Sequence, residues 1–274
     1  MDRLLRLILL VSVAATTMRG AFEERVRGAR LMSLGGVSSS VTGEIWAIPT
    51  NPAVAGTIGD RTLSISVTPE PFGLAELSSA EIAFLQPFKP GSLVVTGSVF
   101  GSDLYRETTV SLSAGGTVCK RFEVGISLTL YGLSIRDYGS ASTIGVTAGV
   151  HFRLSETLCL ALSACNLNGP AIGAVREPLP QVMHAGLSYR PLPGFLIAMD
   201  VGKDLQFPTD LSIGLEYAPI EALFLRGGTT LNPSTYSAGV GLRTAVLRLD
   251  YALSAHPDIG LSQGFSITLV LEGW

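Results

Sequence analysis

The sequence has few charged residues and, beyond its N-terminal stretch, no long apolar run. Asp, Glu, Lys and Arg make up only 15% of its 274 residues, whereas 47% are hydrophobic and the mean hydropathy is +0.42. Helical membrane proteins need runs of about 18 or more apolar residues, so the lack of such runs excludes that class. A chain this apolar and this poor in charge is not disordered either.

Motifs that would carry chemistry are also missing. The three cysteines, Cys119, Cys159 and Cys165, form neither a disulfide framework nor a CxxC metal motif. There is no G-x-S-x-G elbow, no P-loop and no H-E-x-x-H motif, and the three histidines lie far apart. The net charge of −3 provides no basic field for nucleic acid. We therefore expect no enzymatic activity, no cofactor, no metal site and no nucleic-acid partner.

The sequence instead contains many short segments in which apolar and polar or small residues alternate. Over residues 122–130, for example, every second residue is Phe, Val, Ile or Leu, and those between are Glu, Gly, Ser or Thr. A period of two predicts a β-strand, and most segments approach the ~9–11 residues that a tilted strand needs to cross a bilayer. About fourteen are predicted, near 61–68, 79–87, 92–101, 106–116, 121–133, 141–153, 157–166, 181–190, 194–203, 209–218, 221–228, 234–243, 245–254 and 263–273.

A membrane β-barrel reconciles high hydropathy with the lack of long apolar runs, because only alternate residues face lipid. We predict that residues 61–274 form an all-β, antiparallel, up-and-down transmembrane barrel of about 14 strands. A propeller or tandem sandwich would also alternate, but neither explains an apolar face with so little charge. The connections are predicted to be tight on the periplasmic side and longer outside. The longer set comprises residues 69–78, 134–140, 166–180 and 255–262.

The N-terminus has the pattern of an export signal. Arg3 and Arg6 precede a short apolar core at 7–11, and small residues follow it. We expect residues 1–21 to be a signal peptide, cleaved somewhere within 15–21. Export together with a membrane barrel predicts a protein of the outer membrane of a Gram-negative (diderm) bacterium.

Residues 22–60, between the signal and the first predicted strand, differ in character from the rest. They contain G-A-R-L-M-S-L-G-G at 28–36 and N-P-A at 51–53. This segment resembles the N-terminal segment of the FadL/PorV superfamily of outer-membrane β-barrels. Stretches such as N-L-N-G-P at 166–170 and Y-R-P-L-P-G at 189–194 resemble its PorV/PorQ branch. The resemblance implies an N-terminal plug or hatch, with Gly28, Gly35, Gly36, Asn51, Pro52 and Ala53 as its marking residues.

Two interpretations of the plug remain open: a hatch that gates the lumen, or a lead-in that only fills the base of the barrel. If the apolar residues of each strand face lipid, the residues that alternate with them face the lumen. These inward residues include charges of both signs. Mixed charges indicate a paired network that braces the barrel or holds the plug, or else contacts a ligand, rather than a single-sign selectivity ring. The predicted lumen-facing polar residues are Glu123, His151, Arg153, His184, Asp200, Glu216, Arg226, Arg243, Arg248 and Asp250.

Three functions remain open, of which the resemblance implies the first two. The first is a passive conduit for small hydrophobic solutes across the outer membrane. The second is a PorV-like accessory protein of a secretion system, which docks or shuttles secreted cargo. The third is a structural barrel without transport. The expected partners are outer-membrane lipid and either hydrophobic small molecules or secretion-system proteins.

Overall fold

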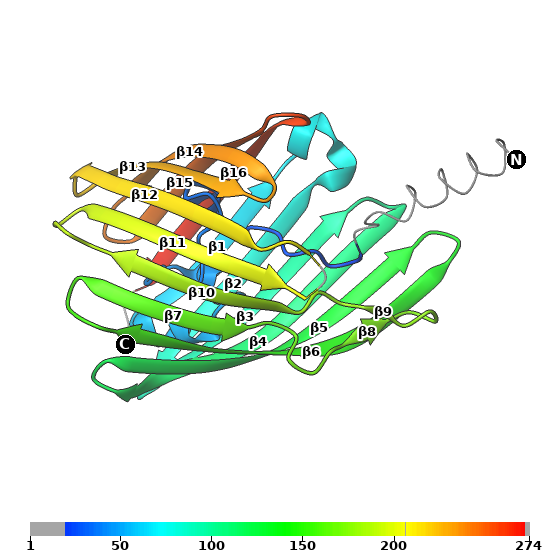
Figure 1. Ribbon diagram of the computed structural model, residues 1–274, viewed down its shortest axis with the longest axis horizontal. Coiled ribbons are helices and arrows are strands. Elements are labelled where there is room, and N and C mark those ends of the chain that lie inside the picture. The colour runs from blue at the N-terminus through cyan, green and yellow to red at the C-terminus, as the bar shows by residue number, and fades with distance from the viewer. Residues whose placement is uncertain (1–19, 206, 272–274) are drawn as a thin grey trace, which may run out of the picture.

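The structure, a computed structural model, describes residues 20–205 and 207–271. These residues form a closed antiparallel barrel of fourteen strands (Figure 1). The barrel strands are β1 (Arg61–Thr68), β2 (Ser79–Phe88), β3 (Gly91–Gly101), β4 (Tyr105–Cys119), β5 (Phe122–Ile135), β6 (Gly139–Arg153), β7 (Leu158–Ala164), β10 (Val182–Tyr189), β11 (Phe195–Asp204), β12 (Asp210–Ile220), β13 (Leu223–Leu231), β14 (Ser234–Arg243), β15 (Leu247–His256) and β16 (Gly260–Leu271). Two short strands, β8 (Ala171–Ile172) and β9 (Glu177–Pro178), pair with each other in the connection between β7 and β10.

The barrel is closed in the simplest way. Each strand pairs antiparallel with the next barrel strand along the chain, and β1 pairs with β16 from Arg61↔Leu271 to Val67↔Phe265. Closure leaves no sheet edge with unpaired backbone groups, as a lipid-embedded sheet requires. The predicted all-β barrel is confirmed, and each of the fourteen predicted segments corresponds to one barrel strand.

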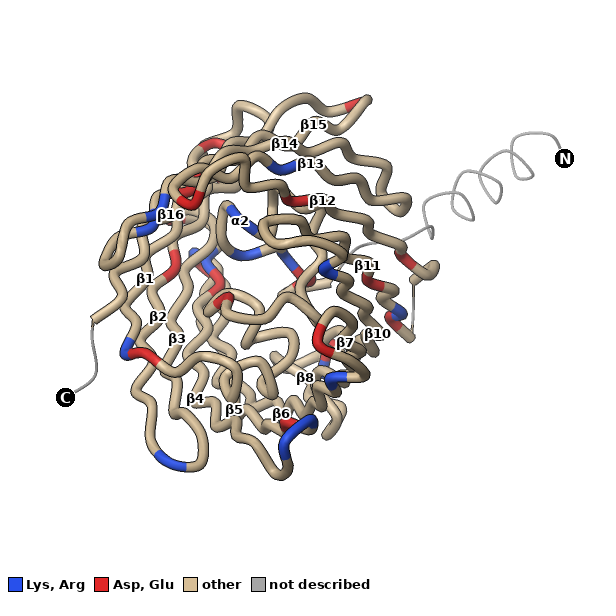
Figure 2. Tube along the Cα trace, turned by 90° about the vertical axis from the view of Figure 1, so that its left-hand side faces the viewer, with Lys and Arg blue, Asp and Glu red and all other residues tan. Residues whose placement is uncertain are grey.

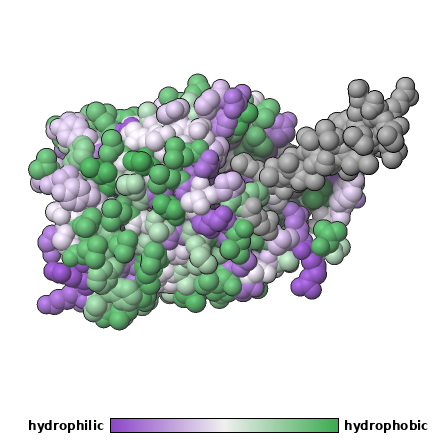
Figure 3. All heavy atoms as spheres, viewed as in Figure 1, coloured by the Kyte–Doolittle hydropathy of each residue, from purple (hydrophilic) through white to green (hydrophobic). Residues whose placement is uncertain are grey.

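The alternation of the sequence becomes an alternation of faces. Along β5 and its neighbour β6, Ile126 and Ile144 are 53% and 56% exposed on the outer surface, whereas Ser127 and Thr147 are buried. Buried and exposed residues alternate strictly along β10 for the same reason. Apolar side chains accordingly cover much of the outer wall (Figure 3), the kind of surface that a bilayer-spanning barrel presents to lipid.

The two ends of the barrel differ in their connections. At one end, here the tight-turn end, hairpins close over short stretches such as 89–90 and 120–121. At the other, here the loop end, residues 69–78 carry the short helices η3 (Pro71–Gly73) and η4 (Ala75–Leu77), and residues 165–181 carry β8 and β9.

Two of the predicted longer loops are wrong. The connections predicted at 134–140 and 255–262 shrink to 136–138 and 257–259, because the strands keep pairing beyond the expected limits. Ser134 pairs with Ser140, and His256 with Gly260. Polar residues at a strand end lower the apolar alternation without preventing backbone pairing between strands already in register.

The hydrophobic core lies inside the barrel, built largely by residues 20–60, here the N-terminal segment. This segment contains α2 (Ala29–Ser33) and the 3-10 helices η1 (Ile45–Ala47) and η2 (Pro52–Thr57). Viewed along the barrel, α2 lies within the ring of strands (Figure 2). Within residues 20–205 and 207–271, no helix is long and apolar enough to cross a membrane. The fully buried members of the core include Leu31, Leu34, Val37, Val41, Ile48 and Val54 of the segment, with Leu85 and Val94 of the wall.

Candidate functional site

The N-terminal segment fits closely against inward-facing glycines of the wall. A Cβ atom on Gly125 of β5 would overlap the Pro52 backbone, and one on Gly228 of β13 would overlap the backbone of Leu34 and Gly35. Glycines at such inward positions let the segment's backbone approach the strands directly. The high glycine content of the sequence, 31 residues, therefore serves in part to hold the segment.

The N-P-A motif ties the segment to β6. The Asn51 side chain is fully buried; its oxygen accepts the Ala53 N–H at 3.1 Å, and its NH2 group donates to the carbonyls of Ser39 (2.9 Å) and Val150 (3.2 Å). Pro52 follows as the first residue of η2, where its missing N–H costs no hydrogen bond. Asn51 thus caps a helix, braces the segment and contacts the wall with one amide.

The glycines of the G-A-R motif occupy turns on either side of α2. Gly28, with φ of 79°, lies against the Trp46 ring, and Gly35, with φ of 69°, lies against the Thr229 backbone of β13. Both combine a backbone conformation that favours glycine with a contact that leaves no room for a side chain. Gly36 follows with φ of 85° beside Val26.

A charged cluster joins α2 to the barrel wall. The Arg30 guanidinium donates two hydrogen bonds of 2.8 Å to the Glu216 carboxylate and lies 3.4 Å from Glu44. Arg226 bonds the same Glu216 at 2.7 Å and Asp250 at 2.6 Å. Bidentate pairs of this kind are strong and geometrically specific.

Burial and the neighbouring charges of this cluster shift the pKa values of Arg30 and Glu44 in the segment. Burial disfavours the charge of Arg30, but the adjacent Glu216 carboxylate outweighs it and raises the pKa of the guanidinium. Burial also raises the pKa of the Glu44 carboxyl, only partly opposed by Arg30. Arg30 therefore stays charged, whereas Glu44 takes up a proton at a higher pH than a free carboxyl group would.

Asp200 of β11 holds a second part of the segment. Its carboxylate accepts the backbone N–H groups of Ser38 (3.1 Å) and Ser39 (2.8 Å) and the Ser39 hydroxyl (2.8 Å). His184 Nδ1 lies 3.9 Å from Asp200, and its Nε2 lies 3.1 Å from Glu24 of the segment. Burial disfavours the charge of Glu24, but His184 outweighs this effect and lowers the pKa of its carboxyl.

A third cluster lies within the wall. Glu123 of β5 pairs with His151 Nδ1 of β6 at 2.9 Å and also with Arg153. Glu123 and His151 are fully buried, whereas the Arg153 side chain is 47% exposed at the tight-turn end. This cluster braces two neighbouring strands.

A cavity of about 540 Å³ lies at the loop end, here the loop-end cavity. Aromatic side chains from the segment and the wall line it: Phe22 packs edge-on to Tyr131 with ring centroids 5.0 Å apart, and the Arg25 guanidinium lies 3.3 Å above the Phe100 ring. Arg25 also pairs with Glu107 at 2.7 Å. Acidic and basic side chains, among them Glu81 and Arg27, line it as well, so the cavity is amphipathic and has the size of a small-molecule site.

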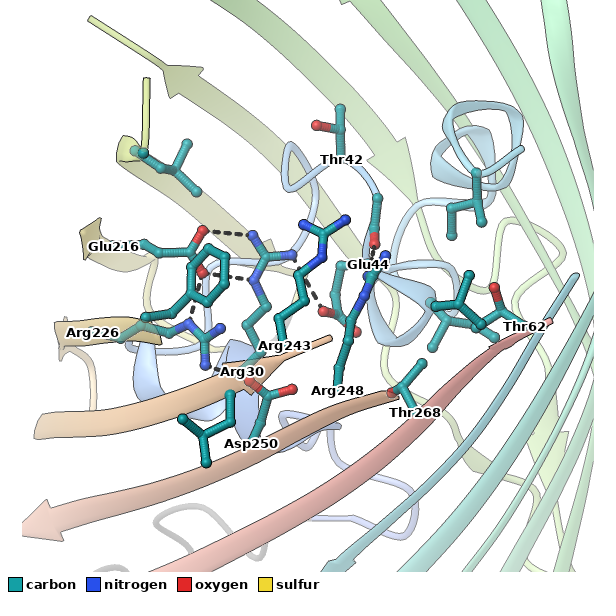
Figure 4. A pocket seen from close by; sticks show the side chains of 18 of the residues that line it. Arg30, Thr42, Glu44, Thr62, Glu216, Arg226, Arg243, Arg248, Asp250 and Thr268 are labelled. Atoms are coloured by element: carbon teal, nitrogen blue, oxygen red, sulfur yellow. Dashed lines mark hydrogen bonds and ion pairs between the residues drawn. The ribbon is translucent and has the colours of Figure 1, made fainter. Parts of the chain in front are cut away.

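A second cavity, of about 310 Å³, opens at the opposite end and is here the tight-turn cavity (Figure 4). Arg30 lines it, whereas the next residues of α2, Leu31 and Met32, line the loop-end cavity. The N-terminal segment therefore separates the two cavities inside one barrel.

The structure brings the predicted lumen-facing residues together in groups. Glu216, Arg226 and Asp250 meet in one cluster, His184 and Asp200 in another, and Glu123, His151 and Arg153 in a third. Arg243 and Arg248 face each other across β14 and β15 near the tight-turn end, where Arg243 is exposed. Over the described part of the chain, no three His, Cys, Asp or Glu side chains are placed to hold a metal ion.

Sequence reasoning missed the partners that the segment supplies. Arg30 and Glu24 contact charged groups of the wall, and Glu44 contacts Arg30, but none of the three belongs to a strand with a parity to read. Only the position of Arg30 within the G-A-R motif signalled a role. Arg190 ends the segment predicted at 181–190 and has its inward parity, but it was not among the predicted lumen-facing residues; the structure places it directly after β10, where it lines the tight-turn cavity.

Comparisons with known proteins point to one fold. The sequence matches no protein-family model and no curated protein. In structure, the toluene transporter TbuX of Ralstonia pickettii is similar with a TM-score of 0.68 at 13% identity, over 92% of this chain and 100% of that chain. The P. putida toluene transporter TodX is similar with a TM-score of 0.68 at 14% identity, over 90% of this chain and 99% of that chain.

A Pseudomonas aeruginosa FadL homologue is also similar, with a TM-score of 0.64 at 11% identity, over 92% of this chain and 100% of that chain. Identities this low establish likeness of fold, and the coverage extends over nearly the whole of each chain. The chain therefore shares its barrel fold with these two toluene transporters and with the FadL homologue.

Proposed function

We propose that this chain is an integral outer-membrane barrel of a Gram-negative bacterium that conducts small hydrophobic solutes passively. The observation that carries the proposal is the pair of cavities at opposite ends of one closed barrel, separated only by the N-terminal segment. The barrel fold shared with the toluene transporters supports it. No reaction is needed, because a solute moves down its concentration gradient.

The first step is capture at the loop end. A hydrophobic solute leaves water for a cavity lined by Phe22, Phe72, Phe100 and Tyr131. The gain is the burial of apolar area, about 25 cal/mol per Å². The volume, about 540 Å³, suits a molecule of one or two rings or a short chain.

The second step is passage beyond the N-terminal segment, which acts as a hatch in this proposal. Besides its buried apolar contacts with the wall, the segment is held by hydrogen bonds and ion pairs at Arg30, Ser39 and Asn51. Contacts of this kind can be exchanged, so a displacement of the segment would join the two cavities. The positive-φ turns at Gly28 and Gly35 are natural hinge points for such a movement.

A PorV-like secretion role, and membership of the PorV/PorQ branch, rest on the motif resemblance alone. The solute conduit is favoured because several loop-end connections, such as 102–104, 136–138 and 257–259, are only three residues long. They provide little surface for docking secreted cargo.

The proposal is tested by uptake of labelled toluene at low concentration into Gram-negative cells that lack an equivalent transporter. Cells that produce this chain are expected to take up toluene several-fold faster than cells with an empty vector. Ser237→Trp should reduce the rate, because Ser237 lines the loop-end cavity and an indole would fill part of it.

Ser234→Trp is the matched control, since Ser234 begins the same strand but is exposed and does not line the cavity. It should keep the wild-type rate at equal amounts of folded protein. Uptake equal to that of the empty vector would refute the conduit.

A further inference from the structure

We propose that the tight-turn cavity is a binding site for a small oxyanion, a carboxylate or a phosphate, held by Arg190, Arg243 and Arg248. This site goes beyond the proposed conduit, because it binds a charged group at the end of the barrel opposite the aromatic loop-end cavity. Its existence does not depend on whether solutes cross the barrel.

The first observation is an unfavourable pairing of like charges. Arg243 of β14 and Arg248 of β15 are direct cross-strand partners. Both side chains extend into the cavity beside Arg30 (Figure 4). Like charges directly opposite each other destabilise a sheet, so an anion between them would remove a repulsion that the folded protein otherwise carries.

The second observation is that the acids of the cavity are already engaged. Glu216 and Asp250 are bound by Arg226, and Arg30 takes Glu216 and Glu44. The remaining acid that lines the cavity, Asp60, is exposed to solvent.

The third observation is that the three arginines keep free donors. Arg190 donates to the Thr42 hydroxyl at 2.9 Å, and Arg248 Nη1 to the Gly43 carbonyl at 3.2 Å. Arg248 Nε is buried and makes no hydrogen bond. Within the described residues, none of the three lies within ion-pair distance of a carboxylate. Guanidinium groups with free N–H donors bind planar carboxylates and phosphates through paired hydrogen bonds.

The cavity also has an apolar side, formed by Ile45, Ile58, Leu196 and Phe224. At about 310 Å³ it admits either a free oxyanion with its water or an oxyanion carried on a small ring or short chain. The arginines would recognise the oxyanion in either case. The apolar side of the cavity would add affinity only for an oxyanion carried on a ring or a chain.

Calorimetric titration of the refolded full chain in non-ionic detergent tests the site, with inorganic phosphate, benzoate, toluene and chloride as separate probes at constant ionic strength. Phosphate and benzoate are expected to bind more tightly than chloride. Arg243→Gln should weaken both by about ten-fold, because it removes one charge-assisted donor group. Toluene binding should be unchanged. If benzoate binds more tightly than phosphate, the ligand is an oxyanion carried on an apolar group. If the two bind with equal affinity, the ligand is a free oxyanion.

Arg121→Gln is the matched control, because Arg121 is exposed at the same end of the barrel but does not line the cavity. It should bind both anions as the wild type does. Arg190→Gln, in a turn rather than a strand, is a second variant whose folding is independent of the β14–β15 pair. The proposal is overturned if neither anion binds the wild type more tightly than chloride, or if both arginine variants bind them unchanged. Toluene uptake would be unaffected by that outcome, so the proposed conduit is tested independently of the oxyanion site.

Discussion

Single residues decide how firmly the N-terminal segment is held inside the barrel. Glu216 is the central one, because it accepts hydrogen bonds from Arg30 of the segment and Arg226 of the wall at once. All three side chains are at least 85% buried, and solvent cannot replace a lost partner. Removing one member of a buried charge cluster leaves the others uncompensated.

We expect Glu216→Gln to lower the free energy of unfolding by about 3 kcal/mol. The measurement is reversible urea unfolding in lipid vesicles. Glu156→Gln, in the exposed turn before β7, is the control and should change stability by less than about 0.5 kcal/mol. Equal stability of the two variants would show that Glu216 does not anchor the segment.

Gly125 provides the corresponding test for close backbone contact. Gly125→Val should displace the segment, because the new side chain would overlap the Pro52 backbone. Limited proteolysis should then cut within residues 22–57, which the wild type protects. Gly97→Ala is the control and should leave the segment in place, since a Cβ on Gly97 meets only the Ile82 side chain, at 3.5 Å. A Gly125→Val protein that resists protease like the wild type contradicts the packing described here.

At the scale of elements, the question is whether α2 must move. A Cβ on Gly264 of β16 would lie 3.8 Å from the Ala29 Cβ of α2, close to the mean separation of disulfide-bonded Cβ atoms, and 2.8 Å from the Met32 sulfur, the flexible end of a side chain that would have to move aside. Ala29→Cys with Gly264→Cys, in a chain whose three native cysteines are replaced by serine, therefore offers a reversible lock between helix and wall.

Oxidation of this pair should abolish most of the toluene uptake, and reduction should restore it, because only the reduced segment can shift. The reduced protein is its own control for expression and folding. Uptake that is the same in both redox states would mean that solutes pass without movement of α2, and the hatch would then be a static filling of the barrel.

The strands show what a local pattern can and cannot define. Their positions follow from alternation, which depends only on neighbouring residues. Their ends do not: β5 continues to Ile135 and β6 already begins at Gly139, because the two backbones keep pairing there although the side chains no longer alternate. The sheet β8–β9 was also not predicted, since each strand is two residues long and carries no periodicity.

The whole molecule combines a barrel wall that is apolar outside and largely polar inside with an N-terminal segment that builds a hydrophobic core within the barrel. In the wall, Ile126 and Leu215 are exposed outside, while Ser113 and Glu123 are buried inside. We expect the chain to fractionate with outer membranes and to migrate anomalously on gels until it is boiled, because a closed barrel resists detergent unfolding at room temperature. Recovery as a soluble periplasmic protein would contradict this arrangement.

The amino-acid sequence by itself determined the barrel, its fourteen strands and the face to which each strand residue belongs, because a period of two is a local property of the chain. It also marked Asn51 and the G-A-R glycines as unusual. Only the tertiary structure decided which charges meet, because the deciding contacts join distant residues: Arg30 and Glu216 are 186 positions apart, and Ala29 and Ser266 are 237 apart. The two cavities have the same origin, since they exist only where the N-terminal segment leaves the lumen unfilled.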